Sequence, residues 1–184
     1  MENNSRYIAW VITFAAVGGA IWLLNRRKSE TPSLIEQDDM STDPKLPRGY
    51  RNNNPLNIRI SANTWKGKVS PNTDGAFEQF VSLQYGYRAA LATMRTYIRK
   101  YGCDTVEKII NRWAPPTENN TSAYIKHVCE IANLEPDTTV GKNDRDTLTK
   151  MAYAMSIIEN GNTEYTRAQG LPDMEIINEG WNLL

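Results

Sequence analysis

The sequence has few of the residues that build metal sites and disulfide frameworks. Its 184 residues include two cysteines, Cys103 and Cys129, and one histidine, His127. This set is too small for a disulfide-stapled fold or a structural zinc site, so we expect neither a metal nor a cofactor. The sequence leaves open whether the two cysteines pair. Any catalysis is expected to come from carboxylates, hydroxyls, amides or a single thiol.

The chain also lacks a net charge of either sign, with 21 Lys+Arg and 21 Asp+Glu. A dedicated nucleic-acid-binding protein normally has a basic excess, so we expect no nucleic-acid partner. The charges are nevertheless unevenly spread. Residues 48–112 hold 11 cations and 4 anions (11 − 4 = +7), whereas residues 113–184 hold 5 cations and 11 anions (5 − 11 = −6). Such a split indicates either two solvated faces that attract each other or a basic wall facing an anionic polymer.

Charge is absent altogether from the stretch 7–24 (YIAWVITFAAVGGAIWLL). At about 1.5 Å rise per residue, a helix of this length spans about 27 Å, close to the apolar core of a bilayer. Three cations follow it where a signal peptide would have a small-residue cleavage site, which favours a retained anchor. We therefore predict a transmembrane anchor in residues 1–25, a flexible linker at 26–47 and a folded domain at 48–184.

The folded domain is predicted to be mainly helical. Residues 50–82 are rich in Asn, Gly, Pro and Ser, which indicates loops and a small hairpin lobe. Apolar residues then recur at helical spacing. Helices are expected over residues 84–101, from Asp104 to before Pro115, and over 119–132, 144–159 and 172–179. The predicted fold class is mainly α (α+β), with a loop and hairpin lobe and one N-terminal transmembrane helix.

One carboxylate interrupts the apolar pattern of its helix. In the helix expected over 144–159, the inward stripe runs from Leu148 to Met155, and the next step of four residues reaches Glu159. An apolar setting and the negative end of a helix dipole both favour the protonated form of a carboxyl group, which a general acid needs. The same pattern also fits a frayed helix end whose glutamate turns into water.

Several segments resemble enzymes that cleave peptidoglycan. Residues 151–161 (MAYAMSIIENG) are similar to the catalytic helix of goose-type lysozymes and lytic transglycosylases, which ends in a glutamate. Residues 118–128 (ENNTSAYIKHV) resemble the transglycosylase segment E-T-x-x-Y-V-x-x-V, and residues 54–58 (NPLNI) resemble the Asn-rich loop of flagellar-type muramidases. Together with residues 110–124 (INRWAPPTENNTSAY), they make the chain similar to lysozyme-like phage virion proteins.

The resemblance implies a lysozyme-like fold that is circularly permuted, because the glutamate follows the Asn-rich loop instead of preceding it. It implies that Glu159 is the catalytic acid, with Glu118 as the runner-up, and that Tyr124 hydrogen-bonds the acid or the substrate. Glu118 also fits a simple helix cap, and Tyr124 an ordinary core residue. The expected substrate-binding residues are Asn54, Asn57, Trp65 and Asn160. Asparagine amides suit N-acetyl groups, although Asn beside Pro is equally a turn former.

The presence or absence of a second carboxylate separates two reactions. In lytic transglycosylases one glutamate acts first as acid and then as base, whereas a hydrolytic lysozyme usually needs another carboxylate. Asp74, Glu78 and Glu118 have no distinctive setting, and alternation places Glu78 on the solvent face of the expected hairpin. We therefore favour transglycosylase chemistry.

These features predict a membrane-anchored, virion-associated enzyme that cleaves the MurNAc-GlcNAc bond of peptidoglycan during penetration of the host wall. The expected partners are peptidoglycan strands, a lipid membrane through residues 7–24, and other virion proteins. A virion membrane also removes a conflict, because the positive-inside rule would place the domain in the cytoplasm of a cell. The alternatives are a non-catalytic virion structural or glycan-binding protein and a cellular membrane-bound muramidase. Leu56, where related sequences commonly have Gly, favours a decayed site.

Overall fold

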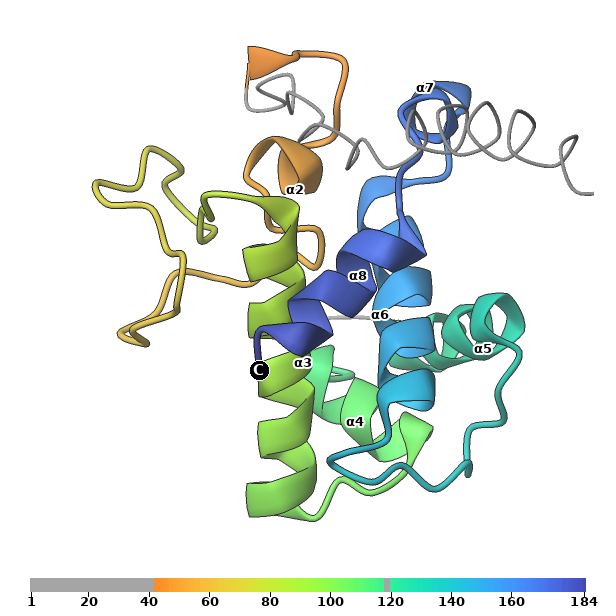
Figure 1. Ribbon diagram of the computed structural model, residues 1–184. Helices are drawn as coiled ribbons and strands as arrows, with labels where there is room; N and C mark the ends of the chain where they lie inside the picture. Colours follow the sequence, from red (N-terminus) through yellow and green to blue (C-terminus); the bar gives the residue numbers. More distant parts are fainter. Residues whose placement is uncertain (1–41, 118–119) are drawn as a thin grey trace, which may run out of the picture. The chain divides into compact units, whose positions relative to one another are not determined.

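Helices carry nearly all the regular structure of residues 42–117 and 120–184, the part of the chain that the computed structural model describes (Figure 1). The helices are α2 (Arg48–Arg51), α3 (Leu83–Tyr101), α4 (Val106–Trp113), α5 (Thr121–Ala132), α6 (Arg145–Asn160), α7 (Glu164–Ala168) and α8 (Met174–Asn182). The five longer helices confirm the predicted ones, with ends that differ by at most three residues. The two short helices, α2 and α7, were not predicted.

Polar side chains cap the first turn of four of the five longer helices, all except α3. The side chains that accept a hydrogen bond from a backbone N–H of the first turn are Thr105 for α4, Asn120 for α5, Asp144 for α6 and Asp173 for α8. Such caps satisfy amides that have no partner inside the helix. Helix α4 is capped by Thr105, one residue after the expected start at Asp104. Helix α3 ends at Gly102, whose φ of 64° suits a residue without a side chain.

Helix α6 forms the centre of the fold, because α2, α3, α5 and α8 all pack against it. Its predicted inward stripe is confirmed, since Leu148, Met151 and Met155 are fully buried. On α5, Val128 is fully buried, whereas Ile131 is 40% exposed. The packing of α5 and α2 on α6 brings distant parts of the chain to the end of α6, where Glu159 lies.

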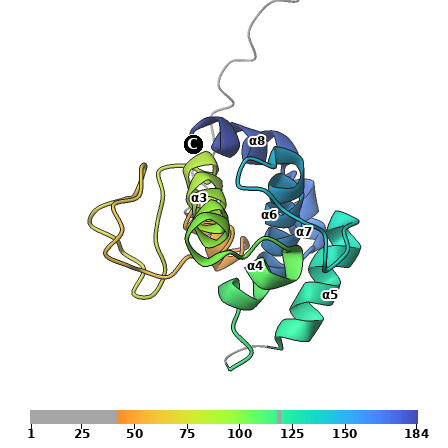
Figure 2. The same cartoon turned by 90° about the horizontal axis from the view of Figure 1, so that it is seen from below.

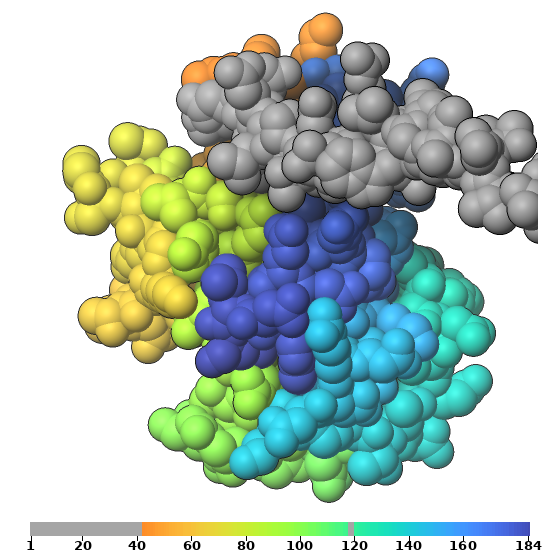
Figure 3. All heavy atoms as spheres, in the orientation of Figure 1, coloured from red at the N-terminus to blue at the C-terminus, as the bar shows by residue number. Residues whose placement is uncertain are grey.

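The segment between α2 and α3 forms a lobe of loops, coloured yellow beside α3 in Figures 2 and 3. Its backbone pairing is limited to two isolated antiparallel bridges, Arg59 with Phe77 and Lys68 with Phe80. The predicted hairpin is therefore reduced to single pairs. The lobe is instead held by side-chain hydrogen bonds to the backbone, in which its many asparagines take part.

The predicted fold class needs a correction, because none of the helices described in residues 42–117 and 120–184 is long and apolar enough to cross a membrane. The longest of them, α3, has 19 residues but includes four cations. The transmembrane helix is therefore not supported, and the fold class becomes a mainly helical domain with a lobe of loops. The stretch 7–24, on which that prediction rested, lies outside the described residues.

Candidate active site

Glu159 occupies the last turn of α6, within the helix and not in a frayed end. Its half-buried side chain accepts two hydrogen bonds. The Tyr124 hydroxyl donates to Oε1 at 3.1 Å, and the Asn57 amide donates to Oε2 at 3.0 Å. Three predicted site residues thus meet, although 35 and 102 positions separate Tyr124 and Asn57 from Glu159 in the chain.

Tyr124 reaches Glu159 because α5 packs along α6. Burial raises the pKa of the Tyr124 hydroxyl far above its ordinary value, and the charge of Glu159 and the hydrogen bond to it act in the same direction. The phenol therefore keeps its proton across the physiological pH range and remains a donor. Such a neutral donor can hold a carboxylate in place without exchanging a proton with it.

The loop after α2 presents Asn57 in a conformation that suits asparagine. Its φ is 49°, in the left-handed region that Asn tolerates better than most residues. Asn54 holds this loop from beneath, since its buried amide donates to the carbonyls of Ile58 and Glu78 at 2.9 Å and accepts from the Ile58 amide at 2.9 Å. Asn54 thus positions the loop that carries Asn57.

Asn160 joins the end of α6 to the same loop. Its buried amide donates to the Pro55 carbonyl at 2.7 Å and to the Ser156 carbonyl at 2.9 Å. Gly49 of α2 lies directly beside it, because a Cβ built on Gly49 would come within 2.2 Å of Asn160 Oδ1 and 2.9 Å of Asn57 Oδ1. Sequence reasoning missed Gly49, since nothing in its neighbours indicates this close approach.

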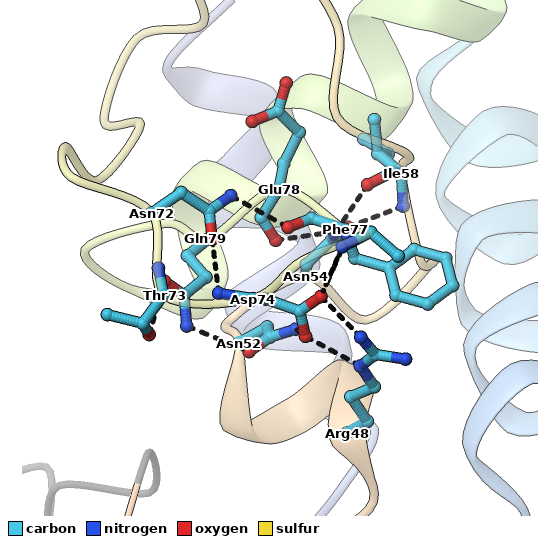
Figure 4. A network of polar contacts seen from close by, with 11 residues as sticks. Arg48, Asn52, Asn54, Ile58, Asn72, Thr73, Asp74, Phe77, Glu78 and Gln79 are labelled. Carbon is cyan, nitrogen blue, oxygen red and sulfur yellow. Dashed lines mark hydrogen bonds and ion pairs between the residues drawn. The ribbon is translucent and has the colours of Figure 1, made fainter.

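The loop lobe is built around Asp74, one of the candidates for a second carboxylate (Figure 4). Asp74 Oδ2 accepts from Arg48 Nε and from Asn52 Nδ2, each at 2.6 Å, and Oδ1 accepts from the amides of Ala76 and Phe77. The hydrogen bonds from Arg48, followed by those from Asn52 and the two amides, hold the pKa of Asp74 well below its usual range. No hydrogen bond among the described residues connects Asp74 with Glu159.

Glu78 is fully buried, so its predicted place on a solvent face is wrong. Its Oε2 lies 2.9 Å from Lys68 Nζ, and its Oε1 accepts from the Ser61 amide at 3.0 Å. Alternation fails because the segment pairs only through isolated bridges, and the loop that carries Ser61 and Lys68 covers the side that a strand would expose. This pair holds one loop against another.

The remaining candidates lie apart from Glu159 or outside the described residues. Trp65 is half-buried in the loop lobe, where its carbonyl accepts from the Lys68 amide at 3.2 Å. Leu56, the unusual residue of the Asn-rich loop, is 1% exposed and belongs to the core. Glu118 lies outside the described residues. Of the seven predicted site residues, Glu159, Tyr124, Asn57 and Asn160 gather at one end of α6, with Asn54 beneath them.

The described chain is thus a helical domain with a hydrogen-bonded carboxylate at the end of its central helix. No protein-family model matches it. Protein P5 of Pseudoalteromonas phage PM2 is 39% identical over 122 residues, which cover 65% of this chain and 74% of Protein P5. The chain therefore belongs to the same bacteriophage protein family as Protein P5. The predicted bacteriophage assignment is confirmed, and the relationship fits the predicted virion location.

Proposed function

We propose that the protein is a virion-associated lytic transglycosylase that cleaves the MurNAc-GlcNAc bond of peptidoglycan during penetration of the host wall. The observation that carries this proposal is the contact of Glu159 with Tyr124 and Asn57. The resemblance assigns Glu159 as the acid, Tyr124 as a partner of the acid or the substrate, and Asn57 to substrate binding. Three separate segments bring them together. The relationship to a phage protein supports the virion setting.

In the proposed reaction, Glu159 first gives its proton to the glycosidic oxygen as the bond from that oxygen to the anomeric carbon breaks. The resulting carboxylate then takes a proton from the sugar's own hydroxyl, whose oxygen attacks the anomeric carbon and closes an anhydro ring. No water is consumed, and Glu159 ends protonated. A carboxylate has about four acceptor positions, so the bonds from Tyr124 and Asn57 leave room for the substrate.

Transglycosylase chemistry is favoured because the second-carboxylate candidates within the described residues have other roles. Asp74 is bound to Arg48 and Asn52, and Glu78 is bound to Lys68 and Ser61. A retaining hydrolase needs its second carboxyl group about 5 Å from the first. The described contacts of Glu159 include only amide and phenol partners.

The test uses the full chain on purified peptidoglycan, with soluble products identified by mass spectrometry. The variants are Glu159→Gln and the matched control Glu135→Gln, which removes an exposed carboxylate from a loop. Anhydro-muropeptides are expected from the wild type and the control, with at least a hundredfold loss for Glu159→Gln. Products with a reducing end would indicate a hydrolase. Equal activity of both variants would exclude Glu159 as the acid.

A second candidate is a non-catalytic virion protein that binds glycan or supports the particle. It is favoured by the position of two surface depressions in the described part, one lined by residues around Tyr101 and Arg112 and the other by residues around Arg95, neither of which includes Glu159. The same experiment distinguishes the two functions. Sedimentation with peptidoglycan in the absence of any released product, by wild type and both variants alike, would establish the non-catalytic role.

A further inference from the structure

A groove lined by cations runs beside α3, away from the residues around Glu159. Arg88, Arg95 and Arg99 come from α3 and Lys142 from the loop before α6, and Leu184 also lines the groove. We call these residues the basic groove. No Asp or Glu side chain lines it within the described residues. Figure 1 shows the end of α8 lying against α3 on this side of the molecule.

The three arginines form a row. They stand at positions i, i+7 and i+11 of α3, which places them on one helical face. At 1.5 Å rise per residue the row is about 16 Å long, with about 6 Å between the levels of Arg95 and Arg99. A row of cations along one line fits an extended polyanion better than a single small anion.

The cationic side chains of the basic groove have N–H donors that are not used in hydrogen bonds within the described residues. The side chains of Arg99 and Lys142 make no hydrogen bond or ion pair with any other residue that the structure describes. Arg95 is held in place by Asn143, whose Oδ1 accepts at 3.2 Å, and by the Trp181 ring, whose centre lies 5.4 Å from the guanidinium. Arg88 donates one hydrogen bond, to the Leu183 carbonyl at 3.0 Å. A guanidinium has five N–H donors, so both arginines can still bind a ligand.

The acidic half of the chain does not neutralise this charge directly. Every ion pair found among the described residues joins two residues within 48–112 or two within 113–184, and none crosses between the halves. Two acids on the neighbouring helices have other partners, since Glu179 accepts from Gln84 at 2.8 Å and Asp146 from Lys150 at 2.6 Å. The excess positive charge of residues 48–112 is therefore not neutralised by ion pairs at the groove.

We propose that the basic groove binds a single strand of nucleic acid through its phosphates. The planar guanidinium matches phosphate geometry, and Arg95, backed by Trp181, offers a flat surface on which a base can stack. This proposal replaces the expectation of no nucleic-acid partner, which rested on the zero net charge of the whole chain. Charges farther away than a Debye length of about 10 Å are largely screened, so the local charge of the groove decides the binding. The expected binding is independent of sequence, in the micromolar range and sensitive to salt.

The test measures fluorescence anisotropy of a labelled single-stranded oligonucleotide with the full chain over a series of salt concentrations. The variant is Arg99→Gln combined with Lys142→Gln, both without described partners, so the fold should be unaffected. Each lost phosphate contact lowers the slope of log K against log salt by about 0.7, so the double variant should lose about 1.4. At 0.1 M salt the affinity should fall by about tenfold or more.

The matched control is Lys66→Gln combined with Lys126→Gln, which removes two exposed cations outside the basic groove. Unchanged binding by this control, with the expected loss in the groove variant, supports the proposal. Equal losses in both variants would show that overall charge is responsible and overturn it. Absence of binding by the wild type at 20 mM salt would also overturn it, as would equal binding of polyglutamate or tighter binding of a glycerol-phosphate wall polymer. Peptidoglycan cleavage should be the same in both double variants, so the two proposals fail separately.

Discussion

At the scale of single residues, Tyr124 fixes one oxygen of Glu159. Tyr124→Phe removes that donor but keeps the ring packed between α5 and α6. A hydrogen bond to a charged group contributes about 1.5–3 kcal/mol, so turnover of peptidoglycan should fall by about ten- to a hundredfold with little change in KM. The measurement is the initial rate of product release. Tyr101→Phe is the control, because that side chain is 55% exposed and its hydroxyl has no described hydrogen bond. Unchanged turnover in Tyr124→Phe would show that the Tyr124 hydroxyl has no role in the reaction.

Asp74 provides a second prediction, on stability and pH. The pKa of Asp74 is lower in the folded chain than in the unfolded chain. Its contribution to the free energy of unfolding is therefore complete above the unfolded pKa of about 3.9, and it is lost as the pH falls toward the folded pKa. Asp74→Asn should lower the free energy of unfolding by about 2–3 kcal/mol at pH 7, and by less at pH 3. Urea unfolding at both pH values measures this. Asp137→Asn, at an exposed position, should change stability by less than about 0.5 kcal/mol.

The predicted residues around Glu159 were accessible from sequence because each carries a local signal. Glu159 ends an apolar stripe, and Tyr124 and Asn57 stand in segments that resemble known motifs. Gly49 and Glu78 have no such signal. The burial of Glu78 depends on Lys68 in a neighbouring loop, and the need for glycine at position 49 depends on Asn160, which lies 111 positions away (160 − 49 = 111). Contacts of this kind exist only after folding.

At the scale of elements, helix positions were predictable because apolar spacing and helix caps depend on residues that are close together in the sequence. Thr105 caps α4, one residue after the expected start at Asp104, and the sequence pattern does not resolve a difference of one position. Helices α2 and α7, with four and five residues, are too short to show an apolar period. The hairpin expected within residues 50–82 forms only isolated bridges, because side-chain hydrogen bonds from asparagines replace most of its ladder.

The junction of α2 with α6 is tested by Gly49→Ala. The added methyl group would lie 2.2 Å from Asn160 Oδ1 and 2.9 Å from Asn57 Oδ1, so the side chains of Asn160 and Asn57 must shift. Overpacking of this kind costs about 1–3 kcal/mol of stability. Because the shift also moves the donor to Glu159, cleavage should fall by at least tenfold. Thermal melting and product release are measured together.

Gly75→Ala is the matched control for this junction, because a Cβ on Gly75 has no atom within 4 Å. It should leave both melting temperature and cleavage unchanged. If Gly49→Ala lowers the melting temperature but leaves cleavage intact, the position of Asn57 does not matter for the reaction, and its proposed role must be abandoned.

At the scale of the whole molecule, the two ends of α6 contribute to two different proposed sites. Its C-terminal turn presents Glu159, whereas the loop before its N-terminus supplies Lys142 to the basic groove. The sixteen residues of α6 separate these ends by about 24 Å along the helix axis. The residues that line the basic groove do not include Glu159 or its partners Tyr124 and Asn57, so we expect the two ligands to bind without competing.

The reactivity of the two cysteine thiols can be used to measure the stability of the whole fold. Both are free, so a reducing agent should leave the melting temperature unchanged. Cys129 on α5 is 8% exposed, and burial raises the pKa of its thiol, with the charges of Glu135 and Glu107 adding to the shift. Because the thiolate is the reactive form, alkylation at pH 8 should modify the half-buried Cys103 well before Cys129.

The decisive measurement is the alkylation rate of Cys129 in the Cys103→Ser chain, followed by mass spectrometry over increasing urea. If α5 leaves α6 only when the whole fold opens, the rate of labelling should follow the free energy of global unfolding. Fast labelling in the absence of urea would mean that α5 separates from α6 in the native state. Tyr124 would then leave Glu159 on the same time scale, and the carboxylate would lose the donor that holds it for catalysis.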